Sequence, residues 1–266
     1  MIFVESGDAV LHAELIGDPE EQPVLCFSNS LGTDFRIWDQ VAAHFAEDYC
    51  LLLYDKRGHG LSDLGRGPVT IDRHVDDLLA IADHFGIERF GLVGLSIGGM
   101  IGQRLAVRAP GRLAALVLCD TAPKIGDAET WNGRIAAVER GGVEAIGDAV
   151  MERWFTEAYR RDEPQTLRLW RNMLTRQSAA GYAASCAAIR DADLTADTGR
   201  IAVPTLVVVG DQDRSTPPDL VGAMAERIPG AHYAVIEGAG HLPCIEQPEA
   251  LAGLIADLLD QVTDDD

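Results

Sequence analysis

The chain lacks features that define three large classes of protein. No run among its 266 residues approaches the ~18 apolar residues that a membrane span needs. No CxxC pair occurs and the five cysteines are an odd number, which argues against a disulfide framework and against a zinc site. The first eight residues, MIFVESGD, contain neither the basic nor the apolar stretch of a secretory signal. We therefore expect a cytoplasmic protein with reduced thiols, no membrane partner and no metal.

Basic residues are scarce. The chain has 22 Lys and Arg against 42 Asp and Glu, a net charge of −20. Nucleic acid is not an expected partner, because binding its phosphate backbone requires a cationic surface. The deficit is uneven: residues 122–200 hold 11 basic and 12 acidic residues, a net charge of −1, so the other 187 residues carry −19.

Short apolar runs alternate with amphipathic stretches through most of the chain. Runs this continuously apolar are typical of parallel strands that are covered on both faces. Their alternation with helices predicts an α/β fold with a mostly parallel sheet. The expected strands lie at residues 24–27, 50–54, 90–93, 115–118, 205–209 and 233–236, after an antiparallel hairpin over residues 1–15. The expected helices of this part lie at residues 71–85, 97–109, 217–228 and 247–260.

Residues 122–200 interrupt this alternation, because no strand-like run occurs there. We interpret them as an all-helical cap over the carboxyl edge of the sheet, inserted into a core domain of residues 1–121 and 201–266. Three of the four tryptophans lie in this cap. Its four helical patterns lie near residues 127–140, 143–157, 164–176 and 179–190.

One glycine-rich segment carries a strong catalytic signal. The hexapeptide GLSIGG at residues 94–99 follows an expected strand and precedes an expected helix. A G-x-S-x-G pattern in this context is typical of a nucleophile elbow, a strained turn that lifts a serine hydroxyl clear of the sheet. Glycines are required where the strand and helix backbones nearly touch, and the helix N-terminus favours developing negative charge. We therefore expect Ser96 to be a nucleophile.

A catalytic serine needs a base and an acid that orients the base. In this arrangement the acid and then the histidine follow the serine along the chain. Asp213 comes just past an expected strand, and we assign it as the acid, with Asp211 as the alternative. His241 ends the segment GAGH at residues 238–241, whose glycines allow the loop to aim the imidazole at Ser96. We expect His241 to be the base and Asp213 to hold its tautomer.

Two backbone N–H groups are expected to bind the oxyanion that forms during acyl transfer. One belongs to Ile97, directly after the nucleophile. The other is expected in the loop SNSLG at residues 28–32, and we assign it to Leu31.

At these residues the chain resembles the α/β-hydrolase superfamily. The elbow, Asp213 and His241 are similar to its catalytic positions, and the segment YDKRGHGLS at residues 54–62 is similar to one of its loops. The resemblance covers about residues 2–260 and implies an α/β-hydrolase fold.

Other segments resemble one family within that superfamily. Most relatives carry His-Gly at the oxyanion loop, whereas this chain has NSLG at residues 29–32, followed by Trp38. With WNGR at residues 131–134 and GYAASCAAIRD at residues 181–191, this departure resembles the 3-oxoadipate enol-lactonases.

The resemblance implies hydrolysis of 3-oxoadipate enol-lactone to 3-oxoadipate in the catabolism of aromatic compounds, through an acyl-enzyme and without a cofactor. The substrate is a small anionic lactone. In an acidic chain its carboxylate requires a local cation, and arginine offers a bidentate fork. Arg134, one helical turn after Trp131, is the candidate, with Trp131 shaping the pocket.

Two other functions stay open at this point. One is a different serine hydrolase on the same fold, such as a carboxylesterase or a cofactor-free haloperoxidase-like enzyme. The other is a ligand receptor without catalysis, although such a protein has no need of Ser96, Asp213 and His241 together. The oligomeric state is also open, a homo-oligomer included.

Overall fold

The computed structural model describes residues 1–264, and within that range eight strands form one sheet. Their order is β1-β2-β4-β3-β5-β6-β7-β8. All strands from β3 to β8 run parallel, whereas β1 and β2 form an antiparallel hairpin that joins the sheet through β4. The predicted α/β fold with a mostly parallel sheet is thus confirmed. The strands are β1 (Ile2–Ser6), β2 (Ala9–Ile16), β3 (Val24–Ser28), β4 (Cys50–Tyr54), β5 (Phe90–Leu95), β6 (Leu113–Cys119), β7 (Thr205–Gly210) and β8 (His232–Ile236).

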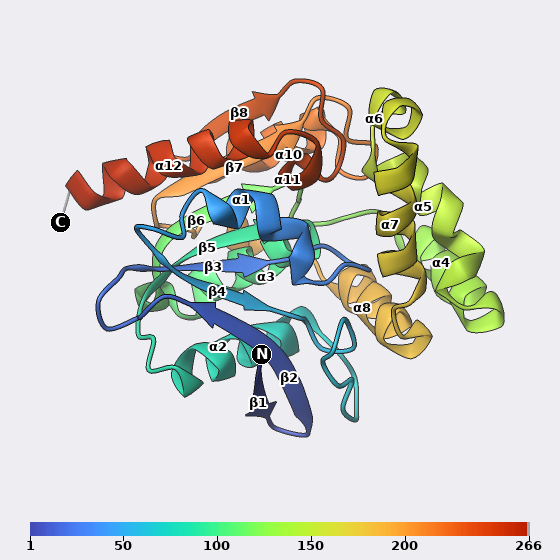
Figure 1. The fold of residues 1–266 in the computed structure, drawn as a ribbon, viewed down its shortest axis with the longest axis horizontal. Coiled ribbons are helices and arrows are strands. Elements are labelled where there is room, and N and C mark those ends of the chain that lie inside the picture. The colour runs from blue at the N-terminus through green and yellow to red at the C-terminus, as the bar shows by residue number, and fades with distance from the viewer. Residues whose placement is uncertain (265–266) are drawn as a thin grey trace.

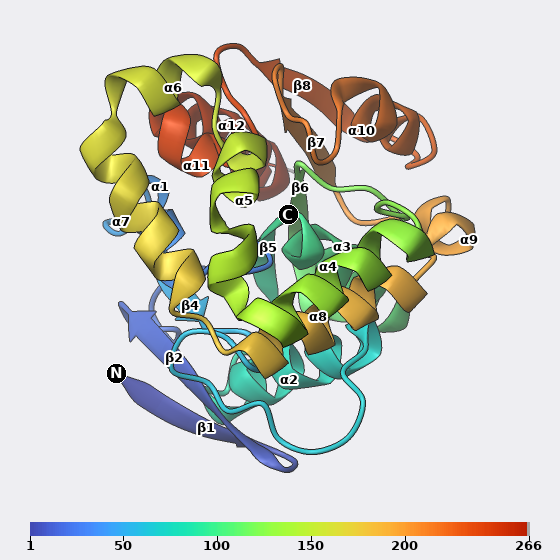
Figure 2. The ribbon, with the colours of Figure 1, turned by 90° about the vertical axis from the view of Figure 1, so that its right-hand side faces the viewer.

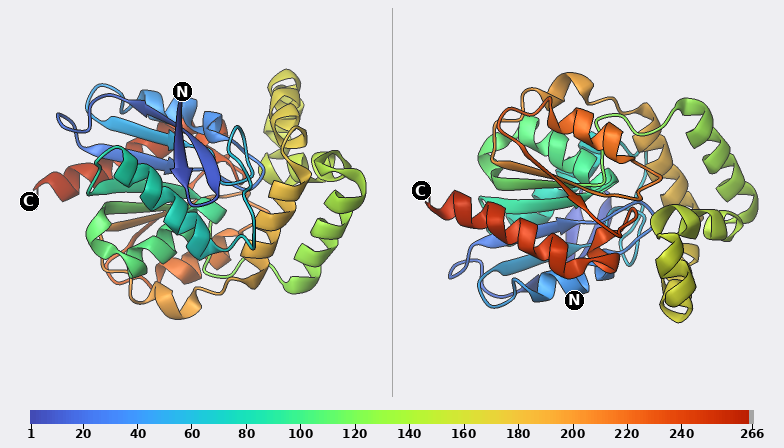
Figure 3. Two further views of the ribbon diagram at one scale, coloured as in Figure 1. Left: turned by 90° about the horizontal axis from the view of Figure 1, so that it is seen from below. Right: turned by 90° about the horizontal axis from the view of Figure 1, so that it is seen from above.

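Helices cover both faces of the sheet, as Figures 1 and 3 show. Helices α1 and α12 lie together on one face, and α2 and α3 lie together on the other. Because both faces are covered, every residue of β3, β4, β5 and β7 is buried, which explains their unbroken apolar runs. The helices of this part, with the 3₁₀ helices labelled η, are η1 (Phe35–Trp38), α1 (Asp39–Ala43), α2 (Ile71–His84), α3 (Ile97–Arg108), η2 (Pro110–Arg112), α10 (Pro218–Ala225), α11 (Pro243–Glu246) and α12 (Pro248–Asp264).

A group of helices between β6 and β7 lies beyond the carboxyl ends of the parallel strands (Figure 1). We call α4 to α8 the cap helices; α4 and α8 lie side by side in Figure 2 and pack against each other. The division of the chain into a core and a cap at residues 122 and 200 stays a prediction. This stretch contains α4 (Ala128–Gly141), η3 (Val143–Ile146), α5 (Gly147–Trp154), α6 (Glu157–Asp162), α7 (Pro164–Thr175), α8 (Ala179–Asp191) and α9 (Thr195–Thr198).

The helices between β6 and β7 differ in three ways from the helical patterns expected there. The single helix expected at residues 143–157 is divided into η3 and α5, and α6 and α9 were not expected. The chain leaves α5 at Phe155, whose backbone is extended, and Thr156 then caps α6 by accepting from the Tyr159 N–H. A capping threonine inside a helical pattern therefore marks the missed boundary.

The interior is apolar and its thiols are unpaired. All five cysteines are buried and free, as small hydrophobic side chains often are. In the described residues no helix combines the length and the apolar character that crossing a bilayer requires.

A buried ion pair joins the loop after β4 to α2. Arg57 donates from Nε and Nη2 to the two carboxylate oxygens of Asp77, at 2.9 and 2.6 Å, and the two side chains are only 2% and 1% exposed. The Ser6 hydroxyl at the end of β1 donates to the same carboxylate at 2.7 Å. This fork satisfies both charges and holds the hairpin, the loop and the helix together.

Replacing Asp77→Ala should leave the buried Arg57 guanidinium with Asp8, which is 34% exposed and 3.1 Å away, as its remaining carboxylate partner. We expect the free energy of unfolding to fall by about 3 kcal/mol, because breaking the buried pair leaves most of this charge uncompensated. Urea denaturation measures this change. The matched control is Asp76→Ala on the same helix, where the carboxylate is 50% exposed and pairs with Arg108; its loss should cost no more than about 1 kcal/mol. Equal effects of the two substitutions would contradict the assignment.

Candidate active site

Ser96 lies in the turn between β5 and α3. Its backbone has φ 58° and ψ −116°, a conformation that residues with a Cβ rarely adopt. The Ser96 N–H donates to Cys119 O at 2.9 Å, and Ser96 O accepts from the Thr121 hydroxyl at 2.7 Å. The end of β6 and the residues after it therefore hold the strained turn in place.

The glycines of the turn are required by the close approach of three backbones. A Cβ at Gly94 would collide with the Gly98 backbone, and a Cβ at Gly98 would collide with Ser28 O on β3. A Cβ at Gly99 would meet the Thr121 side chain. The absence of side chains at these positions lets α3 start directly against the sheet.

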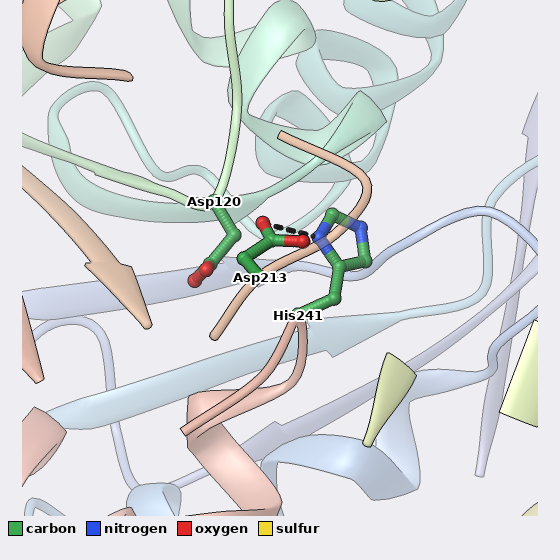
Figure 4. A group of neighbouring side chains, drawn as sticks. All are labelled: Asp120, Asp213 and His241. Atoms are coloured by element: carbon green, nitrogen blue, oxygen red, sulfur yellow. Dashed lines mark hydrogen bonds and ion pairs between the residues drawn. The ribbon is translucent and has the colours of Figure 1, made fainter. Parts of the chain in front are cut away.

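His241 and Asp213 come together from the loops after β8 and β7. Asp213 Oδ2 lies 2.8 Å from His241 Nδ1, as Figure 4 shows. The same carboxylate accepts from the Ser215 N–H, the Thr216 N–H and the Thr216 hydroxyl. Burial alone would raise the pKa of Asp213, but His241 and these donors lower it below its ordinary value. Asp211 is instead exposed and accepts from the Ala239 N–H.

The loop that carries His241 is bound to the cap helices. The His241 N–H donates to Trp154 O at the end of α5, at 2.9 Å. The Glu246 carboxylate accepts from the Gly240 N–H on one oxygen and from the Thr156 N–H and hydroxyl on the other. The position of the imidazole thus depends on contacts with the cap as well as on Asp213.

A second carboxyl group, Asp120, lies behind the Asp213–His241 pair (Figure 4). Asp120 is fully buried after β6; its Oδ1 accepts from the Gly210 N–H at 2.9 Å, and its Oδ2 has no conventional donor among the described residues. One ligand atom from each of the three side chains lies within 4.8 Å of the others. Burial and the nearby Asp213 carboxylate raise the pKa of Asp120 well above its ordinary value. A protonated Asp120 can donate to Asp213 and leave that carboxylate ionised.

Ser96 and His241 line one cavity of about 130 Å³ under the cap helices. The predicted binding residues Trp131 and Arg134 and the predicted oxyanion donor Leu31 line it too, so the structure brings five of the predicted site residues to one space. The complete lining is Ser30, Leu31, Ser96, Ile125, Gly126, Thr130, Trp131, Arg134, Arg153, Trp154, Tyr182, Ile189, Arg214, Ser215 and His241.

The cationic side of this cavity is larger than the sequence analysis indicated. The Arg134 guanidinium lies 4.9 Å from the centre of the Trp131 ring, whose indole N–H donates to Ile125 O. Arg153 and Arg214 also line the cavity and were missed, because nothing local in the sequence separates them from surface arginines. Burial and the nearby Arg134 charge lower the pKa of Arg153. Within residues 1–264 none of the three forms an ion pair with a carboxylate.

Of the two predicted oxyanion donors, Leu31 lines this cavity and Ile97 is not among its lining residues. Ile97 is the first residue of α3, where backbone N–H groups have no partner within the helix. Leu31 lines the cavity from the loop after β3. Their role as donors stays a prediction, as does the catalytic role of Ser96, Asp213 and His241.

A larger groove of about 940 Å³ lies elsewhere, between the β2–η1 region and α7. Its lining includes Phe35, Leu61 and Trp170 but neither Ser96 nor His241. Size alone therefore does not identify the site, and we place it at the smaller cavity, where the titratable groups converge.

Comparison with known proteins places this geometry among hydrolases. A family model described as alpha/beta hydrolase fold matches residues 23–248. The 3-oxoadipate enol-lactonase 2 of Acinetobacter baylyi is 37% identical over 91% of this chain and 90% of its own. The enol-lactonase crystal structure from Burkholderia xenovorans superposes with a TM-score of 0.94 at 35% identity, over 97% of this chain and all of that one. A malate-bound thermophilic esterase from Thermogutta terrifontis has a TM-score of 0.90 at 30% identity, over 98% of each chain.

The Asp120→Asn variant tests whether Asp120 holds a proton in the folded protein. A raised pKa means that folding takes up a proton above the ordinary pKa of aspartate, so Asp120 makes the fold less stable as pH rises from about 4. Asparagine keeps the shape and a donor without titrating. We expect the variant to be more stable than the parent at pH 7, by a margin that narrows as pH falls to 4, as measured by urea denaturation.

The Asp120→Ala variant provides the contrast. It removes the acceptor for the Gly210 N–H as well as the proton donor, and should lower stability at every pH. If Asp120→Asn were as unstable as Asp120→Ala at pH 7, the carboxyl group would be ionised in the fold.

Proposed function

The chain belongs to the alpha/beta hydrolase fold family, and we propose that it hydrolyses 3-oxoadipate enol-lactone to 3-oxoadipate by an acyl-enzyme mechanism. One observation carries the proposal: Ser96 and a buried His241–Asp213 pair line a small cavity that is also lined by three arginines without ion-pair partners in residues 1–264. A serine hydrolase for a small, anionic ester needs this combination of groups.

In the acylation step, Ser96 Oγ attacks the lactone carbonyl carbon. Asp213 occupies His241 Nδ1, so Nε2 is the nitrogen that accepts the serine proton. The negative charge that develops on the carbonyl oxygen is bound by the N–H groups of Leu31 and Ile97. The buried Asp213 carboxylate stabilises the imidazolium that results.

The leaving group suits this site. When the ring C–O bond breaks, the ring oxygen departs as an enol and takes the proton that His241 holds. An enol leaves more readily than an alcohol, and its conversion to a ketone removes the nucleophile that could close the ring again. Water then gives a proton to His241 and attacks the acyl carbon, and Ser96 is released with its proton restored.

The carboxylate of the substrate is expected to bind at the arginines. Arg134 packs on Trp131, and Arg153 lies close enough for the two charges to repel. In a chain of net charge −20 such a pair of cations without carboxylate partners favours an anionic ligand. The cavity of about 130 Å³ is below the range of about 300–1,000 Å³ that is usual for drug-sized ligands, which favours a small lactone.

A second candidate substrate class is a small carboxylic ester without the enol. The similarity to the malate-bound esterase at 30% identity supports it. Both candidates use the same mechanism, and their relative turnover decides between them. The proposal also includes a cytoplasmic location, which the five free, buried thiols support.

Ser96→Ala should lower kcat for enol-lactone hydrolysis by about a thousandfold or more, because the nucleophile is lost. The loss of absorbance of the enol-lactone measures the rate. Ser185→Ala is the matched control, since it removes a buried hydroxyl of α8 that has no hydrogen-bond partner among the described residues. Near-normal turnover by the Ser96 variant would remove this residue from the mechanism.

Arg134→Met should raise KM for the enol-lactone about 10- to 100-fold, because a charge-assisted hydrogen bond to the substrate is lost while an unbranched apolar side chain is kept. Hydrolysis of a neutral ester such as phenyl acetate should change little. Arg140→Met, an exposed position on the same helix, is the control. Equal losses on the charged and neutral substrates would show that Arg134 supports the cap rather than the substrate.

A further inference from the structure

Lys56 is a buried cation next to the site. It is the second residue after β4 and is 1% exposed. Its nearest acidic neighbours are engaged elsewhere: Asp55 accepts from His12, and Asp34 pairs with Arg36. No carboxylate forms an ion pair with Lys56 in the described part of the chain. A buried ammonium without a counterion is costly, so its position calls for a reason beyond packing.

The ammonium group donates to one backbone oxygen. Lys56 Nζ lies 2.9 Å from Ser30 O, in the loop between β3 and η1. The same oxygen accepts from the Thr33 hydroxyl at 2.9 Å and from the Thr33 N–H at 3.4 Å. Three donors converge on this carbonyl, and the peptide that contains it cannot rotate without breaking all of them.

That carbonyl belongs to the peptide whose N–H is contributed by Leu31. A trans peptide is planar, so its C=O and N–H point in opposite directions. Fixing Ser30 O on the Lys56 side therefore fixes the direction of the Leu31 N–H on the other. Ser30 and Leu31 both line the cavity that contains Ser96, and Leu31 N has no hydrogen-bond acceptor within residues 1–264.

We propose that Lys56 is a positioning residue for acyl transfer: its ammonium group locks the Ser30–Leu31 peptide with the Leu31 N–H facing the cavity, and it strengthens that N–H as an oxyanion donor. A charged donor on the carbonyl of a peptide polarises the N–H of the same peptide. The inference rests on the proposed serine-hydrolase function, because it acts only on the charge that develops on the reacting carbonyl oxygen.

The charge state of Lys56 is consistent with this role. Burial lowers the pKa of Lys56 to about 7, while Asp55 and Asp34 act in the opposite direction. With this pKa about half of the molecules carry the ammonium form at pH 7 and nearly all of them carry it below pH 6, and burial leaves its charge poorly screened by water.

The test replaces Lys56→Met, which keeps an unbranched apolar side chain as far as Cε and removes the Nζ donor. We expect kcat to fall about 10- to 100-fold, with KM within threefold of the parent. Complete loss of one oxyanion donor lowers kcat about 100- to 1,000-fold, and here the Leu31 N–H stays in place but is held less firmly. Hydrolysis of 4-nitrophenyl acetate and of the enol-lactone gives the rates. Circular dichroism and thermal unfolding show whether the variant is folded.

Two further variants separate positioning from folding. Thr33→Val removes another donor to Ser30 O without touching the charge, and should lower kcat several-fold. Ser62→Ala is the matched control: it removes a hydroxyl from the same loop as Lys56, but that hydroxyl donates to Asp55 O. Its kcat should stay within twofold of the parent.

Binding of two inhibitors distinguishes a positioning role of Lys56 from a purely structural one. Phenylboronic acid can add to Ser96 and place an oxygen where the oxyanion forms, whereas adipate only fills the cavity. Lys56→Met should weaken binding of the boronic acid about as much as it lowers kcat, and leave adipate binding unchanged. Should Lys56→Met not fold, Thr33→Val should show the same selective loss in smaller measure.

The outcomes are distinct. Unchanged kcat in a folded Lys56→Met protein, or equal weakening of both inhibitors, would overturn the role of Lys56 while leaving the proposed function in place. A parent protein that hydrolyses neither the ester nor the lactone would overturn both.

Discussion

The site depends on the contact between the start of α3 and the sheet. With no Cβ at Gly94 and Gly98, the helix backbone lies against β5 and against Ser28 O on β3. This contact forces Ser96 into its strained conformation at the carboxyl edge of the sheet. The loops that follow the other parallel strands lie at the same edge, so His241, Asp213 and the cap helices come near Ser96 there.

Several charged side chains near Ser96 lack an oppositely charged partner within residues 1–264. The chain is strongly acidic, yet Arg134 and Arg153 form no ion pair within the described residues, and the buried Lys56 donates there to a backbone oxygen rather than to a carboxylate. On the opposite side Asp120 is buried next to Asp213 with one oxygen unpartnered in the same residues. Each arrangement costs folding free energy, and such costs are concentrated where charge must be bound or moved.

Much of the fold could be predicted from local sequence patterns. The features that could not be predicted depend on tertiary packing. Unbroken apolar runs predict parallel strands because a strand that is covered on both faces must be apolar along its whole length, which can be read from its own sequence. The glycine pattern around Ser96 and the glycines before His241 likewise encode local geometry. Asp120, Arg153 and Lys56 belong to no motif, because their significance depends on neighbours that are distant in sequence.

Hydrogen bonds join the cap to the loop that carries His241. His241 N–H is held by Trp154 O, and Glu246 joins Gly240 to Thr156. A cap that swung away from the sheet would have to break these bonds, and the loop that places the imidazole would lose its anchor on the cap. Under the proposed function, free entry of bulk water and alignment of the imidazole for proton transfer would therefore exclude each other.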